Sequence, residues 1–309
     1  MKDVINYNYN FDVNEIEENK NYTSFKYNGE YFYFVFFNRI EEELNDLIEI
    51  CYELKLKGIR VHDIILNRYN KVLTKVGENN YIMLKLNCKK DEIINFIEIC
   101  EYTSKLKLNG NNSRLYRNNW GDLWSKKIDY FEYQIKEIGK NKQIVLDSFS
   151  YYIGLAENAI SYVNKVNRTI GLKEYDNISL SHRRIFAPNI GLNYFNPLSF
   201  IFDLEVRDIA EYLKTIFFNN EDSLLDLKTY LKIKKLTPYS YNMLFARLLY
   251  PSYYFDIYED IMNNNQDEEK LVYIIEKVND YELFLVKAYE EISRYSYLDK
   301  IDWLIKKKL

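Results

Sequence analysis

The spacing of apolar positions along the chain changes near residue 90, from mixed strand and helix patterns to a mostly helical pattern. Before it, short aromatic and aliphatic runs predict strands: a hairpin over 22–38 and two further strands over 61–69 and 79–87. The pair Asn28–Gly29 is a strong turn signal within the hairpin. Residues 39–58 are amphipathic at helical spacing, so the predicted order is β-β-α-β-β.

The helix expected over 39–58 has one apolar face. We assign four residues to that face: Leu44, Ile48, Cys51 and Leu54. Gly58 suits the C-terminal cap. The first turn carries Glu41, Glu42 and Glu43, which we expect to be solvated and favoured by the helix dipole.

After residue 90 the pattern is mostly helical. Amphipathic segments begin at Asp91 and recur over 124–139 and 150–166, and residues 224–309 predict several more helices. Trp120 and Trp124 are four positions apart and share one helical face. Core packing is the default interpretation of that face, and an exposed aromatic anchor for a partner protein is the alternative.

Two short β-type stretches, 179–185 and 198–205, interrupt the helical part. Directly after them, Asp208 reads as an N-cap, with Glu211 three places later as its capping-box partner. A small β-β-α-β-β lobe followed by a larger helical lobe with an internal β-pair is the layout of an α+β, protein-kinase-like, two-lobed fold. We place the N-lobe at residues 1–90 and the C-lobe at 91–309.

Composition narrows the function without naming one. The 309 residues carry 42 Lys and Arg against 46 Asp and Glu, and a net charge of −4 argues against nucleic acid as a partner. No apolar run is long enough to predict a membrane span, and the polar, acidic start predicts no signal peptide. The three cysteines, Cys51, Cys88 and Cys100, show no metal or redox spacing and are expected to be buried free thiols.

Phosphoryl transfer in a kinase-like fold needs a Gly-rich cover and a strand lysine, and the sequence predicts neither. Gly29 is the only glycine before the first expected helix and belongs to a turn. Aromatic and aliphatic residues occupy the strand where the lysine would lie. Lys26 and Lys85 lie on other predicted strands, and one of them would have to replace it.

The stretch "LSHRRIFAPNI" has the H-x-D-x-x-x-x-N spacing of a kinase catalytic loop, with His182 first and Asn189 last. Arg184 stands where the catalytic aspartate belongs. A guanidinium is cationic at physiological pH, so it cannot accept a hydroxyl proton, and it repels Mg²⁺. No catalytic residue is therefore expected in this degenerate loop, and His182 is expected to be structural.

Asp203 follows an apolar strand, 14 positions after Asn189, as a metal-holding aspartate would. Asp203 and Asn189 together predict at most a weak Mg²⁺ site beside Arg184, and the preferred interpretation of Asp203 is a hydrogen-bond acceptor in the turn at the strand end. His62, the other histidine, is expected on a strand surface. No metalloprotease, hydrolase or Walker-type motif is present.

Several segments resemble the YutH-type spore coat proteins, which are related to the CotS-type coat proteins and more distantly to aminoglycoside and choline phosphotransferase-like kinases. They are "WGDLWSKKIDYFEYQI", "YYIGLAENAISYV", "LSHRRI", "NPLSFIFDLEVRDIAEYLK" and "YSYNMLFARLLYPSYYFD". The resemblance covers roughly residues 120–256. It implies a kinase-like fold with eroded catalytic residues, synthesis in the cytoplasm of an endospore-forming bacterium, and a location in the spore coat.

Three functions stay open. The first is a non-catalytic, pseudokinase-type structural or assembly component of the spore coat, with other coat proteins as partners and no cofactor. The second is a divergent ATP- and Mg²⁺-dependent small-molecule or protein phosphotransferase. The third keeps nucleotide or small-ligand binding without turnover.

Overall fold

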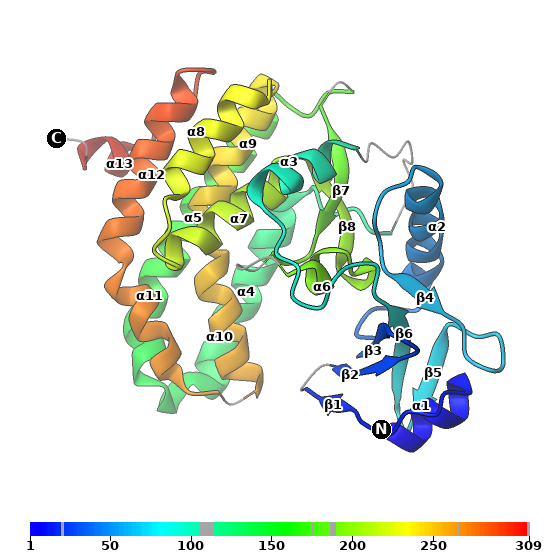
Figure 1. Cartoon of the computed structure of the whole chain (residues 1–309). Helices are drawn as coiled ribbons and strands as arrows, with labels where there is room; N and C mark the ends of the chain where they lie inside the picture. The colour runs from blue at the N-terminus through cyan, green and yellow to red at the C-terminus, as the bar shows by residue number, and fades with distance from the viewer. Residues whose placement is uncertain (20–21, 106–113, 175, 186–189, 265, 308–309) are drawn as a thin grey trace. The chain divides into compact units, whose positions relative to one another are not determined.

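A computed structural model of the chain describes residues 1–19, 22–105, 114–174, 176–185, 190–264 and 266–307 (Figure 1). The chain forms two compact units. Unit 1 comprises Met1–Asn95, Asn109–Tyr116 and Pro188–Ile201, and unit 2 comprises Phe96–Leu108, Arg117–Ala187 and Phe202–Leu309. Since unit 1 is not one continuous stretch of sequence, the single division into residues 1–90 and 91–309 stays a prediction.

Unit 1 is built on an antiparallel sheet with the order β1-β2-β3-β6-β4, and β5 pairs with β6. Its strands are β1 (Glu17–Glu18), β2 (Tyr22–Tyr27), β3 (Glu30–Phe36), β4 (Asp63–Ile65), β5 (Leu73–Val76) and β6 (Asn79–Lys85). Its helices are α1 (Lys2–Tyr9), α2 (Glu42–Leu56) and the short α6 (Gly191–Tyr194), with a 3-10 turn at Pro197–Ser199. The predicted β-β-α-β-β elements are all present, as β2, β3, α2, β4 and β6, and α1, β1 and β5 are additions that the prediction lacked.

Alternate side chains of β2 and β3 point to the same face of the sheet, and on one face they are aromatic and buried. Phe25 and Phe32 stack across β2 and β3, and together with Phe34 they pack against Ile5 and Tyr9 of α1. Phe25, Phe32 and Phe34 are at most 5% exposed. The N-terminal helix therefore covers one face of the sheet and supplies the core that a two-sided sheet requires.

The hairpin turn has the backbone that the sequence predicts. Asn28 and Gly29 both have positive φ angles, 48° and 84°, as a two-residue turn joining right-twisted strands requires. Gly58, just after α2, also has a positive φ of 67°, which confirms it as the C-terminal cap.

The predicted apolar face of α2 is only partly correct. Cys51 and Leu54 are buried, but Ile48 is 36% exposed, and Leu47 and Ile50 fill the core in its place. The helix begins at Glu42 and not at residue 39, so its buried face is turned relative to the prediction.

Histidine 62 was expected on a strand surface, and this is wrong, because its side chain is fully buried within unit 1. Nε2–H donates to Leu192 O at 3.0 Å, and Nδ1 accepts from the Asn87 backbone N–H at 3.3 Å. Burial lowers the pKa of His62 to about 4. The ring is therefore a neutral connector between β6 and α6.

Unit 2 is mostly helical. Its helices are α3 (Phe96–Lys105), α4 (Trp120–Ile138), α5 (Gln143–Thr169), α7 (Arg207–Phe218), α8 (Ser223–Ile233), α9 (Pro238–Leu249), α10 (Ser252–Asn264), α11 (Val272–Glu276), α12 (Val278–Ser293) and α13 (Asp302–Lys306). Strands β7 (Ile178–His182) and β8 (Phe200–Leu204) form the separate two-stranded sheet, as predicted. The long helix α5 packs against α4 and α9, and α12 also packs against α9 (Figure 1). Helix α9 is buried along almost its whole length.

The remaining fold predictions are also answered. Trp120 is fully buried and Trp124 is 5% exposed, which confirms the core interpretation of that helix face. All three cysteines are free thiols, and Cys51 and Cys100 are buried while Cys88 is half-buried. Within the described ranges, no helix combines the length and apolarity needed to cross a membrane.

Candidate functional site

The segment with catalytic-loop spacing begins at His182, the last residue of β7. The carboxylate of Asp208 fixes the position of His182. The His182 backbone N–H donates to Asp208 Oδ1 at 2.9 Å, and ring Nδ1–H donates to Oδ2 at 2.6 Å. A carboxylate can only accept, so this contact places the proton on Nδ1. His182 is 1% exposed and thus has the buried, hydrogen-bonded environment of a structural histidine.

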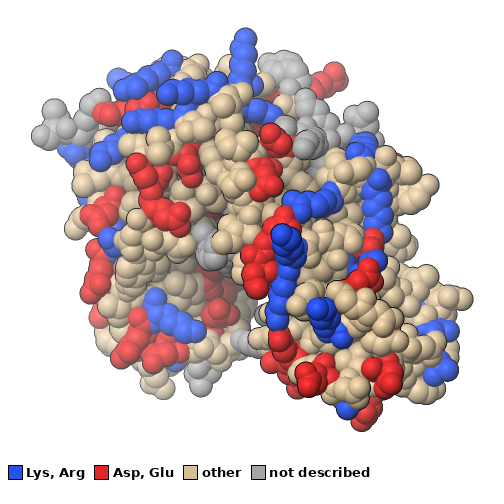
Figure 2. Space-filling model, in the orientation of Figure 1, with Lys and Arg blue, Asp and Glu red and all other residues tan. Residues whose placement is uncertain are grey.

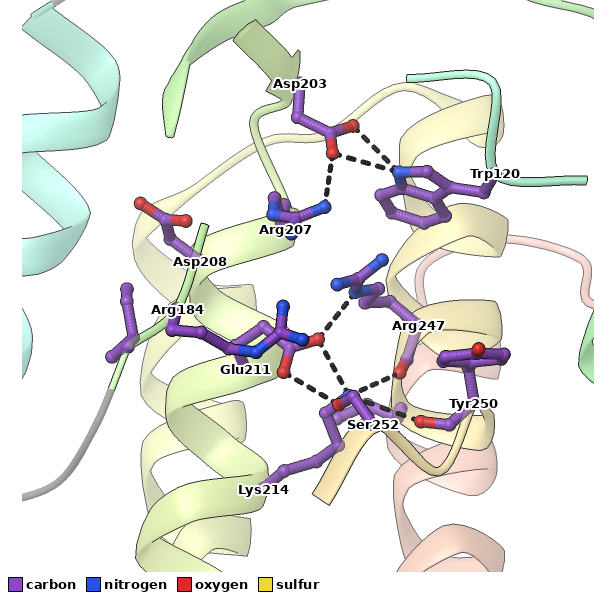
Figure 3. A network of polar contacts seen from close by, with 12 residues as sticks. Trp120, Arg184, Asp203, Arg207, Asp208, Glu211, Lys214, Arg247, Tyr250 and Ser252 are labelled. Carbon is purple, nitrogen blue, oxygen red and sulfur yellow. Dashed lines mark hydrogen bonds and ion pairs between the residues drawn. The ribbon is translucent and has the colours of Figure 1, made fainter. Parts of the chain in front are cut away.

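This contact corrects the capping prediction. Helix α7 begins at Arg207, its N-cap is Val206, and no side chain caps it. Asp208 is instead the second helical residue, and it turns its carboxylate toward β7. Glu211 also points into the core rather than back to the helix start (Figure 3).

The basic residue at the catalytic position is paired. Arg184 Nη2 donates to Asp256 Oδ1 of α10 at 2.5 Å, and Nη1 donates to the Arg183 carbonyl at 2.8 Å. The Arg184 side chain is 34% exposed and that of Asp256 is 29% exposed. Asn189, at the far end of the predicted loop, lies outside the described residues.

Asp203 at the end of β8 is fully buried and surrounded by donors. Trp120 Nε1–H lies 2.8 and 3.0 Å from its two oxygens, Arg207 Nη1 donates to Oδ2 at 2.6 Å, and the Leu204 N–H donates to Oδ1 at 2.7 Å. Burial raises the pKa of Asp203, and the positive charge of Arg207 opposes that rise.

The arrangement around Asp203 does not fit a Mg²⁺ ligand. Mg²⁺ requires oxygen lone pairs directed at it in near-ideal octahedral geometry, and both Asp203 oxygens already accept strong hydrogen bonds. Over the parts of the chain that the structure describes, no three His, Cys, Asp or Glu side chains gather in a way that could hold a metal ion. The weak site at Asp203 and Asn189 stays a prediction.

Arg207 links this carboxylate to the loop. Besides its ion pair with Asp203, its Nε donates to the His182 carbonyl at 3.0 Å and its Nη2 to the Arg183 carbonyl at 3.3 Å. One guanidinium thus connects β8, α7 and the end of β7. Sequence reasoning did not assign Arg207 this role.

Behind Arg207 lies a buried charge cluster, formed by Glu211, Lys214, Arg247 and Ser252 (Figure 3). Glu211 Oε1 accepts from Lys214 Nζ at 2.8 Å and from Arg247 Nε at 2.6 Å, and Oε2 accepts from Ser252 Oγ at 2.8 Å. Lys214 Nζ also donates to the carbonyls of Arg247 and Tyr250. The members come from α7, α9 and α10, so the cluster joins three helices.

Burial and charge act in opposite directions on Glu211. Burial raises its pKa, but the positive charges of Lys214 and Arg247 outweigh burial and hold it well below its usual range. Burial lowers the pKa of Lys214 to about 8. Glu211 is therefore ionised at neutral pH, and it compensates two buried cations.

Aromatic rings complete the surroundings of the cluster. The Arg247 guanidinium lies 5.1 Å from the Trp120 ring centre and 5.5 Å from that of Trp124. The Trp124 ring stacks on Tyr250 at 4.1 Å. Trp120 therefore contacts both Asp203 and Arg247. No local pattern in the sequence predicted this network.

In unit 1, neither candidate lysine occupies the phosphate-pairing place on β3. Lys26 is exposed on β2, with its Nζ 5.5 Å from the Tyr31 ring centre. Lys85 on β6 forms ion pairs with Glu30 at 3.2 Å and Asp63 at 3.8 Å. An open cavity of 840 Å³ adjoins Lys26, Tyr31 and the Lys90 side chain.

The first turn of α2 also differs from its prediction. Glu43 is 4% exposed, and it pairs with Arg39 Nε at 2.6 Å. Arg39 Nη1 further donates to the carbonyls of Leu198 and Phe200. Glu43, which was expected in solvent, is therefore part of another buried ion pair. Its cation lies four residues earlier in the sequence and not on a strand.

The antiparallel-sheet unit and the mostly helical unit have the fold of aminoglycoside phosphotransferases, as solved structures show. An aminoglycoside phosphotransferase from Alicyclobacillus acidocaldarius superposes with a TM-score of 0.66, covering 95% of this chain and 96% of that one at 10% identity. The spectinomycin phosphotransferase APH(9)-Ia gives 0.60 at 11% identity, covering 94% and 96%. These likenesses show the fold alone.

The family is identified from the sequence. The model described as "Spore coat putative kinase YutH" matches residues 2–288, and the chain belongs to this family. A curated relative, the endospore coat-associated protein YutH of Bacillus subtilis (strain 168), is 29% identical over 208 residues, which is 60% of this chain. The match spans 61% of that relative's length.

Proposed function

We propose that this chain is a non-catalytic member of its family and acts as a structural or assembly component of the endospore coat. One observation carries the proposal: the catalytic-base position holds Arg184, which is bound to Asp256. A cation that is already paired cannot take a proton from a hydroxyl group. The coat location rests on the family and on the printed name of the relative.

Two further observations support the absence of turnover. Asp203 has its charge compensated by Arg207, and both of its oxygens accept hydrogen bonds. The β3 strand carries buried aromatic side chains in place of a lysine. Phosphoryl transfer depends mainly on positioned cations and metal ions, so losing these parts together removes most of its electrostatic stabilisation.

The test is a phosphotransfer assay on the purified chain with MgATP, with Asp203→Ala as the matched variant. We expect no ATP hydrolysis or transfer above the rate of a denatured sample. A rate that Asp203→Ala abolishes would refute the proposal. A fluorescent fusion in an endospore-forming host tests location, and signal confined to the mother-cell cytoplasm would contradict the coat role.

Nucleotide binding is the second candidate, because the unit 1 cavity places Lys26 and Lys90 beside an aromatic ring. ATP and Mg²⁺ belong to the chain only under this candidate or under the divergent phosphotransferase. Thermal unfolding with MgATP separates the cases, since ligand at about 100 times its Kd adds about 2.7 kcal/mol of stability. A rise in melting temperature that Lys26→Ala removes would support nucleotide binding in this cavity. If millimolar nucleotide does not change the melting temperature, nucleotide binding and the divergent phosphotransferase are both excluded.

A further inference from the structure

A groove of 460 Å³ lies in unit 2 between α5 and the segment that follows α12. None of its lining residues belongs to the catalytic-loop region or to the buried charge cluster. One wall is α5, and the other is the segment 299–306, which includes α13. The residues that matter for its chemistry are Asn158, Ser161, Lys165, Lys300, Trp303 and Lys306.

Buried contacts fix both walls. The Tyr162 hydroxyl on α5 donates to Asn242 Oδ1 at 2.7 Å, and Asn242 Nδ2 donates to the Tyr297 carbonyl at 3.1 Å. Beyond Tyr297, Leu298 and Leu304 are each 2% exposed, so the second wall is anchored in the core. The groove is therefore preformed, which lowers the entropy cost of binding.

The groove carries an excess of positive charge. Lys165 pairs with Asp299 at 2.9 Å. Lys300 and Lys306 are exposed, and neither has an ion-pair partner within the described ranges. With Asp302 as the other acidic lining residue, three lysines face two aspartates.

One more cation lies near the helical wall of the groove. Arg168, in the last turn of α5 and three residues after Lys165, is exposed. Figure 2 shows blue Lys and Arg side chains at the upper left of the view, where α13 and the upper ends of α8 and α12 lie in Figure 1.

We propose that this groove binds an extended acidic segment of a partner protein. Carboxylates of the segment meet Lys300 and Lys306, and an apolar side chain lies against the half-buried Trp303 ring. The Asn158 and Ser161 side chains, which face the groove from α5, offer hydrogen bonds to the peptide backbone.

The shape and charge favour a polypeptide over other anions. A concave groove admits a single extended chain, whereas a bilayer requires a surface that it can meet broadly. Asp299 and Asp302 lie within the same groove and repel the evenly spaced phosphates of a nucleic acid. A peptide can place neutral residues opposite these two aspartates.

The probe is a fluorescein-labelled peptide of alternating Glu and Leu, measured by fluorescence anisotropy against the full chain. Lys300→Glu combined with Lys306→Glu should weaken binding roughly tenfold or more, because two ion pairs become repulsions. Lys126→Glu combined with Lys136→Glu, two exposed lysines of α4, makes the same change in net charge and should leave the affinity unaltered. A Lys-Leu peptide should not bind.

Trp303 supplies a readout local to the groove. Trp120 and Trp124 are buried, so quenching by the acidic peptide should come from Trp303 and should disappear in Trp303→Leu. That variant should also weaken binding while keeping the salt dependence, because it removes apolar contact and no charge. If the reversed-charge pair unfolds, Lys300→Gln with Lys306→Gln provides the same test without introducing acidic groups.

The proposal fails if the Lys300 and Lys306 variants bind the acidic peptide as tightly as the wild-type chain. It also fails if anionic vesicles or single-stranded DNA compete through the same two lysines at lower concentration than the peptide. A change of oligomeric state in these variants, measured by light scattering, would identify a second copy of this chain as the occupant and overturn the proposal. None of these results depends on phosphotransfer activity.

Discussion

Arg207 Nη1 lies 2.6 Å from Asp203 Oδ2, so the carboxylate in the metal-holding position has a counter-ion four residues along its own chain. Asp203 is fully buried and Arg207 is 7% exposed. A buried pair of this kind need not add net stability, but breaking it leaves an uncompensated charge in the core. This relationship governs how the region responds to mutation.

Arg207→Gln should lower the free energy of unfolding by about 3–5 kcal/mol, because it leaves the Asp203 carboxylate without its cation. Combining it with Asp203→Asn should cost clearly less than the sum of the two single changes. Urea denaturation of the wild type and the three variants measures this coupling. Strict additivity would show that the two residues do not act as a pair.

Glu211→Gln should be among the most damaging single substitutions, with a loss of about 3–5 kcal/mol, because Lys214 and Arg247 both lose their counter-charge. Glu276→Gln, on the exposed surface of α11, is the matched control and should change stability by less than about 0.5 kcal/mol. Equal urea midpoints for the two variants would contradict this account of the cluster.

Acidification should destabilise unit 1 through His62. Its pKa is 6.5 when unperturbed and about 4 in the folded chain, so between these values the unfolded state binds the extra proton. The contribution of neutral His62 to the free energy of unfolding is therefore fully present above pH 6.5. It is lost as the pH falls toward 4, by about 3 kcal/mol in total.

The corresponding variant is His62→Gln, whose amide can still donate to the Leu192 carbonyl. Its unfolding free energy should vary less between pH 7 and pH 5 than that of the wild type, as measured by urea denaturation at each pH. Identical pH dependence in both proteins would mean that His62 is not the titrating group.

Arg184→Asp should not create a phosphotransferase, although it restores the expected residue at the catalytic position. The strand lysine is still missing, and Asp203 is still bound to Arg207 and Trp120. The new aspartate would also face Asp256, so we expect a loss of stability from like charges. A kinase rate in this variant above that of the wild type would overturn the account.

The sequence predicted the fold because its signals are local. Alternation along β2 and β3, the Asn28–Gly29 turn and the helical periodicity of α4 and α5 all appear within windows of a few turns. The β7-β8 pair could also be predicted from the sequence, because two short apolar runs lie on either side of a polar stretch.

The polar site was harder to predict, since its contacts join distant residues. Asp208 and Glu211 have capping-box spacing, but their partners are 26 and 36 positions away, at His182 and Arg247. The helix begins two residues earlier than predicted, and both carboxylates point inward. His62 was misplaced for a similar reason, because its acceptor is contributed by Leu192, 130 positions later.

The position of Arg207 has a consequence for how stability depends on metal ions. A buried carboxylate whose charge is compensated only by a metal ion destabilises the surrounding structure until the ion binds. Here the compensating charge is part of the same polypeptide and also holds the His182 and Arg183 carbonyls. Packing around Asp203 therefore does not depend on a bound ion, and the melting temperature of unit 2 should be the same in chelator as in magnesium.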